Sequence, residues 1–401
     1  MIDPIPVLKE IVKEGKTKIV LLVIDGVGGL PVNGKTELER ADIPELDKLA
    51  RESSCGLIEP VFPGLTPGSG PGHLALFGYH PIKYNIGRGI LEALGVDLEV
   101  KGGDVTARGN FCTVEGDVVV DRRAGRIPTE KNRELIELLR SKIERIEDVE
   151  VILKSGREHR FVLLLRGPGL SDRVTDTDPH KEGERVLSCR ATAPEGEKTA
   201  RVVNEFLSRV REILKNEKPA NFVLLRGFSG MPDIPLFPDT YKIKACGIAT
   251  YPMYRGLARL VGMEVYPAGE TPQDLVHTLR ELWQRYDYFY LHVKKTDSYG
   301  EDGNFDGKVH MLEEVDRIIP EILSLSPDVF AVTGDHSTPA LMRSHSWHPV
   351  PFILHSRFAL PDDARAFTER ECAKGILGRF PALYVTSLLL AHAGRLDKFG
   401  A

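Results

Sequence analysis

The sequence predicts an α/β fold, with a mostly parallel β-sheet flanked by helices and an inserted α+β domain. Two observations carry this prediction. Continuous apolar runs near the start and in the second half of the chain are separated by helical patterns, as in parallel sheets that helices cover on both faces. Between them, the chain alternates apolar and polar residues over short runs that end in turns, which is typical of antiparallel strands.

The first predicted strand is the apolar run "KTKIVLLVID" (Lys16–Asp25), which ends in an acid. Four more strands are predicted in the second half of the chain, at residues 221–227, 288–293, 328–334 and 351–354. A helix is predicted at 271–286, where Thr271 suits the N-cap and Asp274 the third position of a capping box. A second helix is predicted at 308–325.

The length of 401 residues favours two domains, or one core with an insertion. Residues 100–218 are predicted to form an inserted cap domain, and residues 1–99 and 219–401 the discontinuous core. The insert contains a turn-rich stretch at 103–128 and a charged helical stretch at 129–148. Its length is sufficient for a domain.

The composition is that of a soluble globular protein, with 42% hydrophobic and 28% charged residues. The net charge of −5 gives no sign of a nucleic-acid partner, and no apolar run is long enough to span a membrane. The start of the chain lacks a signal-peptide pattern. Five widely spaced cysteines without a CxxC pair favour neither disulfides nor a thiolate metal site, so we expect a cytoplasmic protein.

Acids and imidazoles stand where the predicted strands end, which is where ligands gather in parallel sheets. They are Asp25 after the first strand, Asp297 and Glu301 after 288–293, Asp335 and His336 after 328–334, and His345 and His348 before 351–354. Acids gathered at one edge repel one another unless a cation balances them. We therefore expect one or two divalent metal ions, and such ligands suit manganese, zinc or magnesium, with the histidines disfavouring a site for magnesium alone. Taken singly, Asp25 is better explained as a helix or turn cap, and histidines in loops commonly bond only to the backbone.

Ser69 lies in the glycine-rich stretch "FPGLTPGSGPGHLALFGYHP", between a predicted strand and a predicted helix. A hydroxyl at a helix N-terminus lies where an anion is favoured, which suits a bound phosphate or a serine that becomes phosphorylated. A neighbouring metal ion would make the hydroxyl nucleophilic. The alternative is a flexible turn, since the stretch is neither a Walker A motif nor a G-x-S-x-G elbow.

The insert is rich in arginines, which recognise phosphate and carboxylate groups in bidentate fashion. The candidates are Arg108, Arg122, Arg123, Arg126 and Arg160. A solvated basic surface is the alternative interpretation.

The chain resembles the archaeal-type cofactor-independent phosphoglycerate mutases of the alkaline phosphatase superfamily. The resemblance covers essentially the whole chain and rests on "VIDGVGG", "TPGSGPGHLALFGY", "GRGILEALGV", "DRRAGRI", "DTDPH", "HVKKTD", "TGDHSTP" and "HSWHPVP", which occur in the family's order. It implies interconversion of 3-phosphoglycerate and 2-phosphoglycerate, a step of glycolysis and gluconeogenesis, without 2,3-bisphosphoglycerate. It also implies two divalent ions, Mn²⁺ before Zn²⁺, Co²⁺ or Mg²⁺.

The resemblance also implies a role for each matching residue. Asp25, Ser69, Asp335 and His336 would hold one ion, and Asp297, Glu301 and His345 the other, with Glu301 standing where the family has a histidine. Ser69 would be the nucleophile, and the insert would act as a lid. Substrate-binding roles fall on Arg108, Arg122, Arg123, Arg126, Arg160, Asp178 and His180 in the insert, and on Arg255 and Lys294 in the core. For Asp178 and His180, acid–base chemistry and a role in holding their loop are both open.

Two other functions are compatible with the same residues. A related phosphotransferase or phosphomonoesterase, for example of the homoserine-kinase-like group, would act on another small phosphorylated hydroxy acid. The "DRRAGR" stretch favours the mutase. A metal-dependent binding or structural protein with a degenerate site is the third interpretation, and Glu301 is the residue that supports it.

Overall fold

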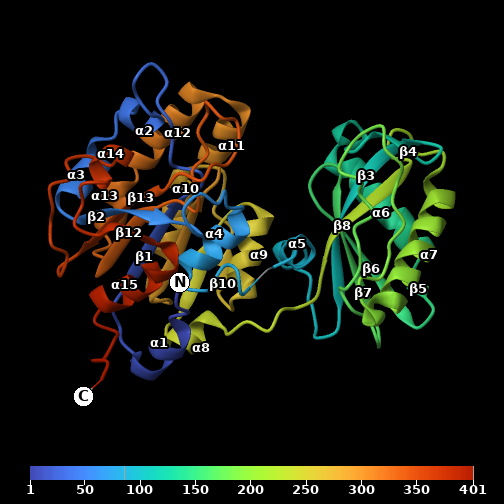
Figure 1. Ribbon diagram of the computed structural model, residues 1–401, viewed down its shortest axis with the longest axis horizontal. Coiled ribbons are helices and arrows are strands. Elements are labelled where there is room, and N and C mark those ends of the chain that lie inside the picture. Colours follow the sequence, from blue (N-terminus) through green and yellow to red (C-terminus); the bar gives the residue numbers. More distant parts are fainter. Residues whose placement is uncertain (85, 401) are drawn as a thin grey trace. The chain divides into compact units, whose positions relative to one another are not determined.

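The computed structural model describes residues 1–84 and 86–400. Their contacts divide the chain into two compact units (Figure 1). The first unit consists of the described parts of residues 1–85 and 234–401, and the second of residues 86–233. Within the described residues, no helix combines the length and the apolar character needed to cross a membrane.

The first unit is built on one eight-stranded sheet with the order β10-β9-β11-β1-β12-β13-β2-β14. Its strands are β1 (Ile19–Ile24), β2 (Ser54–Glu59), β9 (Ala245–Ile248), β10 (Glu264–Tyr266), β11 (Tyr288–Val293), β12 (Val329–Thr333), β13 (Val350–Ser356) and β14 (Gly378–Pro381). Strand β13 runs antiparallel to both neighbours, and the remaining pairs are parallel. Every residue of β1, β11 and β12 is buried, as expected for central strands of a sheet covered on both faces.

Helices surround this sheet (Figure 1). They are α1 (Ile5–Ile11), α2 (Glu37–Arg40), α3 (Pro44–Arg51), α4 (Ser69–Leu76), α8 (Phe237–Tyr241), α9 (Pro252–Leu260), α10 (Pro272–Leu282), α11 (Lys295–Asp302), α12 (Phe305–Asp316), α13 (Ile319–Leu323), α14 (Glu369–Cys372), the 3₁₀ turn η3 (Ala382–Tyr384) and α15 (Val385–His392). The predicted capping box of Thr271 and Asp274 is present at the start of α10. The single helix predicted at 308–325 is wrong, because the chain forms α12 and α13 there. Pro320 lies in the first turn of α13, where its missing N–H costs no hydrogen bond.

The second unit has its own antiparallel sheet and its own apolar core. The strands are β3 (Val105–Glu115), β4 (Val118–Asp121), β5 (Arg145–Ile146), β6 (Val149–Ser155), β7 (Arg160–Arg166) and β8 (Phe222–Ser229), and the helices are α5 (Arg88–Gly95), η1 (Ala124–Arg126), α6 (Thr129–Lys142), η2 (Pro194–Gly196) and α7 (Glu197–Leu214). Helices α6 and α7 contribute to that core, whereas α5 lies on the other side of the sheet (Figure 1).

The second unit is wider than the predicted insert of residues 100–218. Helix α5 before the insert and β8 after it both belong to the second unit, because β8 pairs antiparallel with β3 over Phe222–Ser229. The prediction that 221–227 is a strand of the parallel core sheet is therefore wrong. A fully apolar run suits the middle of either sheet, and the sequence does not say which partner it takes.

Candidate active site

The carboxyl ends of three neighbouring strands meet at one edge of the large sheet. In the register of β1 with β11, Ile24 lies opposite Val293, and in its register with β12, Val23 lies opposite Thr333. The polar residues that follow these strands are therefore side by side, as predicted. Asp25 follows β1, Lys294 follows β11, and Asp335 and His336 follow β12 by a few residues.

Asp25, Asp335 and His336 form a first buried group of metal-type ligands. The Nε2 atom of His336 lies 3.3 Å from Asp25 Oδ1 and 3.2 Å from Asp335 Oδ2. It also lies 3.2 Å from the Oγ atom of Ser69. Metal–ligand bonds of about 2.1 Å separate neighbouring ligands by about 3.0–3.4 Å, so these four residues fit one small dication.

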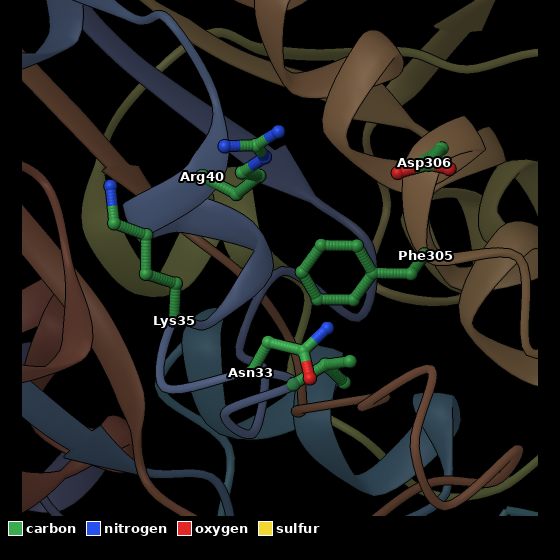
Figure 2. A pocket seen from close by; sticks show the side chains of 6 residues that line it. Asn33, Lys35, Arg40, Phe305 and Asp306 are labelled. Atoms are coloured by element: carbon green, nitrogen blue, oxygen red, sulfur yellow. The ribbon is translucent and has the colours of Figure 1, made fainter.

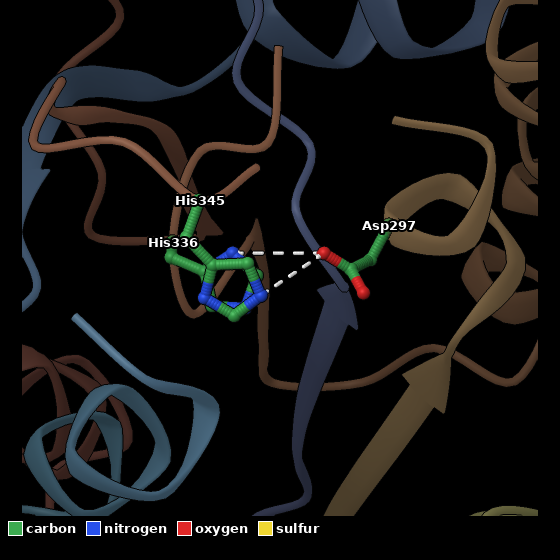
Figure 3. A group of neighbouring side chains, drawn as sticks. All are labelled: Asp297, His336 and His345. Atoms are coloured by element: carbon green, nitrogen blue, oxygen red, sulfur yellow. Dashed lines mark ion pairs between the residues drawn. The ribbon is translucent and has the colours of Figure 1, made fainter. Parts of the chain in front are cut away.

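Asp297, His336 and His345 form a second group (Figure 3). Asp297 Oδ1 lies 3.5 Å from His345 Nε2 and 4.0 Å from His336 Nδ1, and the two imidazole rings stack 3.6 Å apart. The hydroxyl of Thr338 donates to Asp297 Oδ1 at 2.6 Å and lies 3.0 Å from His336 Nδ1. Because this hydroxyl already donates its proton, we assign the hydrogen of the neutral ring to Nδ1. The Nε2 lone pair of His336 then faces the first group.

Glu301 lies outside both groups. It follows Asp297 by one turn of α11, its Oε1 atom is 3.8 Å from His345 Nε2, and 55% of its side chain is exposed. Partial burial and repulsion from Asp297 raise its pKa above the ordinary value. Glu301 is close enough to His345 to act with it as a metal ligand from the exposed side of the site.

Buried negative charge dominates this edge of the sheet. Burial, and next to it repulsion from Asp25, raises the pKa of Asp335 to about 8. Burial alone would also raise the pKa of Asp25, but Lys294 and His292 hold it well below its ordinary value. In the described part of the chain, both carboxylate oxygens of Asp25 and the Oδ2 atom of Asp335 lack a well-formed hydrogen bond. Such oxygens are the ligands that a divalent cation would satisfy.

Lys294 supplies one of the positive charges in this site. Its Nζ atom lies 3.2 Å from Asp25 Oδ2 and also pairs with Asp297 Oδ2. Burial would lower the pKa of Lys294, but attraction to these two carboxylates outweighs burial and raises it. Lys294 therefore stays protonated between the two groups of ligands.

Ser69 is the first residue of α4, as predicted, and its hydroxyl lies at the helix N-terminus. The Oγ atom accepts a hydrogen bond of 3.3 Å from the hydroxyl of Tyr254. One turn on, Gly72 packs against the end of β12, where a Cβ atom would lie 2.3 Å from the carbonyl oxygen of Asp335. A glycine at this position therefore allows α4 to bring Ser69 to the metal-type ligands.

Sequence reasoning missed several residues that support the site. His73 on α4 is one of them. Its Nδ1 atom lies 2.9 Å from the carbonyl oxygen of Ser69 and also 3.2 Å from Asp335 Oδ2. His292 stacks on Tyr254 at 3.7 Å and lies 3.3 Å from Asp25 Oδ2. Burial lowers the pKa of His73 and of His292 to about 4, so both rings are neutral at pH 7. His292 could have been found as the single histidine in an apolar predicted strand, whereas no feature of the sequence marks Tyr254.

Four of the five predicted arginines of the second unit come together around His159. Burial, and then repulsion from the four neighbouring guanidinium groups, lowers the pKa of this histidine to about 4; the four are Arg160, Arg108, Arg123 and Arg126. The histidine is therefore neutral and adds no charge to a strongly basic region. Such a cluster is suited to binding an anion.

Arg122 is held differently from the other predicted arginines. Its Nε and Nη2 atoms donate to the two carboxylate oxygens of Asp178 at 3.0 and 2.6 Å. Asp178 also accepts from the backbone N–H of His180 at 2.9 Å, which supports the loop-holding role. Arg88 and Arg226 were not predicted, yet both lie near enough to Arg108 to lower its pKa, after burial as the main cause, to about 10.

Arg255, the remaining predicted residue, is half-buried on α9 next to Tyr254. A separate pocket of about 450 Å³ is lined by Val32, Asn33, Lys35, Arg40, Phe305 and Asp306 (Figure 2). None of these six is a predicted site residue, so this pocket is not the candidate active site.

The large sheet carries a serine hydroxyl beside two groups of metal-type ligands at its carboxyl edge. Together they define an α/β protein with a candidate metal-dependent active site, and the predicted α/β class is confirmed. Residues 50–221 match the family profile described as 2,3-bisphosphoglycerate-independent phosphoglycerate mutase. A probable enzyme of that name from Thermotoga neapolitana is 56% identical over the full length of both chains. One from Aquifex aeolicus is 54% identical over 98% of this chain and all of its own. The chain therefore belongs to the 2,3-bisphosphoglycerate-independent phosphoglycerate mutase family.

Solved structures agree with this assignment. The cofactor-independent phosphoglycerate mutase from Thermoplasma acidophilum is 30% identical, with a TM-score of 0.71 over 94% of this chain and 100% of its own. The PH0037 protein from Pyrococcus horikoshii is 32% identical, with a TM-score of 0.83 over 96% of this chain and 100% of its own.

Proposed function

We propose that the chain interconverts 3-phosphoglycerate and 2-phosphoglycerate through a phosphoserine at Ser69, without 2,3-bisphosphoglycerate. The observation that carries this proposal is the position of the Ser69 hydroxyl, 3.2 Å from His336 Nε2 and at the N-terminus of α4. The first-turn N–H groups of the helix would favour the negative charge of a phosphoryl group there. We further propose that the reaction serves glycolysis and gluconeogenesis in the cytoplasm.

Two divalent ions are part of the proposal, with Mn²⁺ preferred because the ligands are carboxylates and imidazoles. The first would be held by Asp25, Ser69, Asp335 and His336, and the second by Asp297 and His345, with Glu301 as its most exposed ligand. When bound, the ions would supply positive charge that lowers the pKa of the serine hydroxyl and neutralises phosphoryl oxygens.

The chain's own residues then carry the transfer. The Ser69 oxygen attacks the phosphorus of 3-phosphoglycerate, the bond from phosphorus to the 3-oxygen breaks, and the proton lost by the serine is gained by that oxygen. The 2-hydroxyl of the glycerate next attacks the phosphorus of the phosphoserine, the bond from phosphorus to the Ser69 oxygen breaks, and the proton of the 2-hydroxyl returns to that oxygen. Lys294, positioned by Asp25 and Asp297, would pair with phosphoryl oxygens. We assign a supporting role beside it to Arg255.

The substrate's carboxylate and phosphate need cationic partners as well. We assign this role to the arginines around His159, which are Arg108, Arg123, Arg126 and Arg160. Arg122 with Asp178 and His180 would hold the adjoining loop.

The test is incubation with 3-phosphoglycerate and Mn²⁺, with enolase added to report 2-phosphoglycerate, and with free phosphate measured in parallel. We expect 2-phosphoglycerate without release of phosphate. Free phosphate without 2-phosphoglycerate would overturn the mutase and favour a phosphomonoesterase of the same superfamily.

A further inference from the structure

We infer that Lys308 is a positioning residue that ties the loop after β1 to the loop after β12 and so sets the affinity of the site for metal. The side chain is fully buried in α12. Its Nζ atom donates to three carbonyl oxygens, at 2.8 Å to Gly26, 3.0 Å to Gly28 and 2.9 Å to Thr338. Three donors meet three acceptors, which an ammonium group alone among side chains can provide from one atom.

Each of these acceptors lies within three residues of a candidate metal ligand. Gly26 directly follows Asp25, and Thr338 comes two residues after His336. The hydroxyl of Thr338 is the one that contacts both Asp297 and His336. The backbone N–H of Thr338 also lies 3.2 Å from the carbonyl oxygens of Gly26 and Gly28. Lys308 therefore joins the two loops at the point where both present their ligands.

The charge of Lys308 is balanced by Glu37, an acid that is not one of the metal-type ligands. Glu37 is also fully buried, and its Oε1 atom lies 3.7 Å from the ammonium and accepts 2.8 Å from the N–H of Ala340. Glu369 fixes the same loop from α14, by accepting 2.7 Å from the N–H of Gly29. The acid paired with the lysine is thus Glu37, which is not a candidate ligand.

If Lys308 had only a structural role, replacing it would lower the stability of the protein without changing metal binding. A matched control variant separates this case from the inference. Arg395 is 1% exposed and also donates to carbonyl oxygens, those of Gly15 and Thr17 at 2.9 Å each. Both acceptors precede β1, whereas the metal-type ligands follow the carboxyl ends of the strands. Arg395→Met therefore removes a comparable buried cation away from the site.

The experiment titrates Mn²⁺ into metal-free full-length protein by calorimetry and measures thermal unfolding of the same metal-free samples. We expect Lys308→Met to weaken Mn²⁺ binding at least tenfold. Arg395→Met should lower the unfolding temperature and leave the Mn²⁺ affinity unchanged. Equal Mn²⁺ affinity in Lys308→Met and wild type would overturn the inference.

If Lys308→Met does not fold, Lys308→Gln replaces it, because its shorter amide group donates at most two hydrogen bonds and cannot join all three carbonyl oxygens. We expect weaker Mn²⁺ binding in this variant, and an unchanged affinity would overturn the inference. The inference rests on the proposed metal site, and different results would contradict the inference and the proposed function. Wild-type protein that binds no Mn²⁺ contradicts the proposed function, whereas equal binding by wild type and variant contradicts the role of Lys308 alone.

Discussion

Replacing Asp335 by asparagine should make the metal-free protein more stable at pH 8 while abolishing its function. Asp335 is fully buried close to Asp25, and its pKa is raised to about 8. In the unfolded chain the same carboxyl has its ordinary pKa near 3.8. The folded state therefore holds a proton that the unfolded state releases, so stability falls as the pH rises through this window. Asparagine is of similar size and carries no titrating group.

The size of the effect follows from the two pKa values. Each pH unit inside the window changes the free energy of unfolding by about 1.4 kcal/mol. From pH 5 to pH 8 the free energy of unfolding of the wild type should therefore fall by up to about 3–4 kcal/mol more than that of Asp335→Asn. Because Asp25 and Asp335 repel each other, the difference between the two proteins reports the titration of this coupled pair.

The assay is urea unfolding of both proteins after chelation of metals, at pH 5 and pH 8, with Mn²⁺ titration of the same samples. The reasoning predicts that the stability of the variant relative to wild type increases from pH 5 to pH 8. It also predicts loss of Mn²⁺ binding in the variant. A relative stability that does not change with pH would refute the account of buried, uncompensated charge.

Three further variants test other parts of the site. Ser69→Ala should reduce mutase activity by at least about a thousandfold, with urea unfolding measured to show that the fold is kept, and an active variant would exclude the phosphoserine. Gly72→Ala should lower the free energy of unfolding in urea by about 1–3 kcal/mol and weaken Mn²⁺ binding, because the new Cβ atom would lie 2.3 Å from the carbonyl oxygen of Asp335. Wild-type stability together with wild-type Mn²⁺ affinity would count against the packing argument. Glu301→Ala should weaken Mn²⁺ binding less than His345→Ala in parallel calorimetry, because Glu301 is 55% exposed and lies outside both groups, and the reverse order would show that it is a main ligand.

The sequence was most informative where function depends on strand ends. An apolar run followed by an acid was enough to place Asp25 and Asp335 at one edge, because parallel strands end together. The strand at β8 was also found, but its partner was not, since an apolar run carries no information on which sheet it joins. Pro320 marked a boundary that the helical pattern around it concealed.

Residues that act through packing gave little signal. Tyr254 reaches Ser69 from α9 and belongs to no recognisable local pattern. Thr338 stands in the "TGDHSTP" stretch, but nothing in that stretch marked it as the residue that bridges Asp297 and His336. From the sequence alone, Lys308 is expected to be one of the charged residues of an ordinary surface helix, although the fold buries it completely. Contacts of this kind depend on the distances between elements that are remote in the chain, and a single sequence does not encode these distances locally.

Anomalous diffraction from crystals soaked in Mn²⁺ would test the central claim most directly. The account predicts one manganese peak within about 2.5 Å of Asp25, Asp335, His336 and the Oγ atom of Ser69, and a second beside Asp297 and His345. A well-ordered site without manganese between these side chains, or with the hydroxyl of Ser69 turned away from the metal, would contradict it.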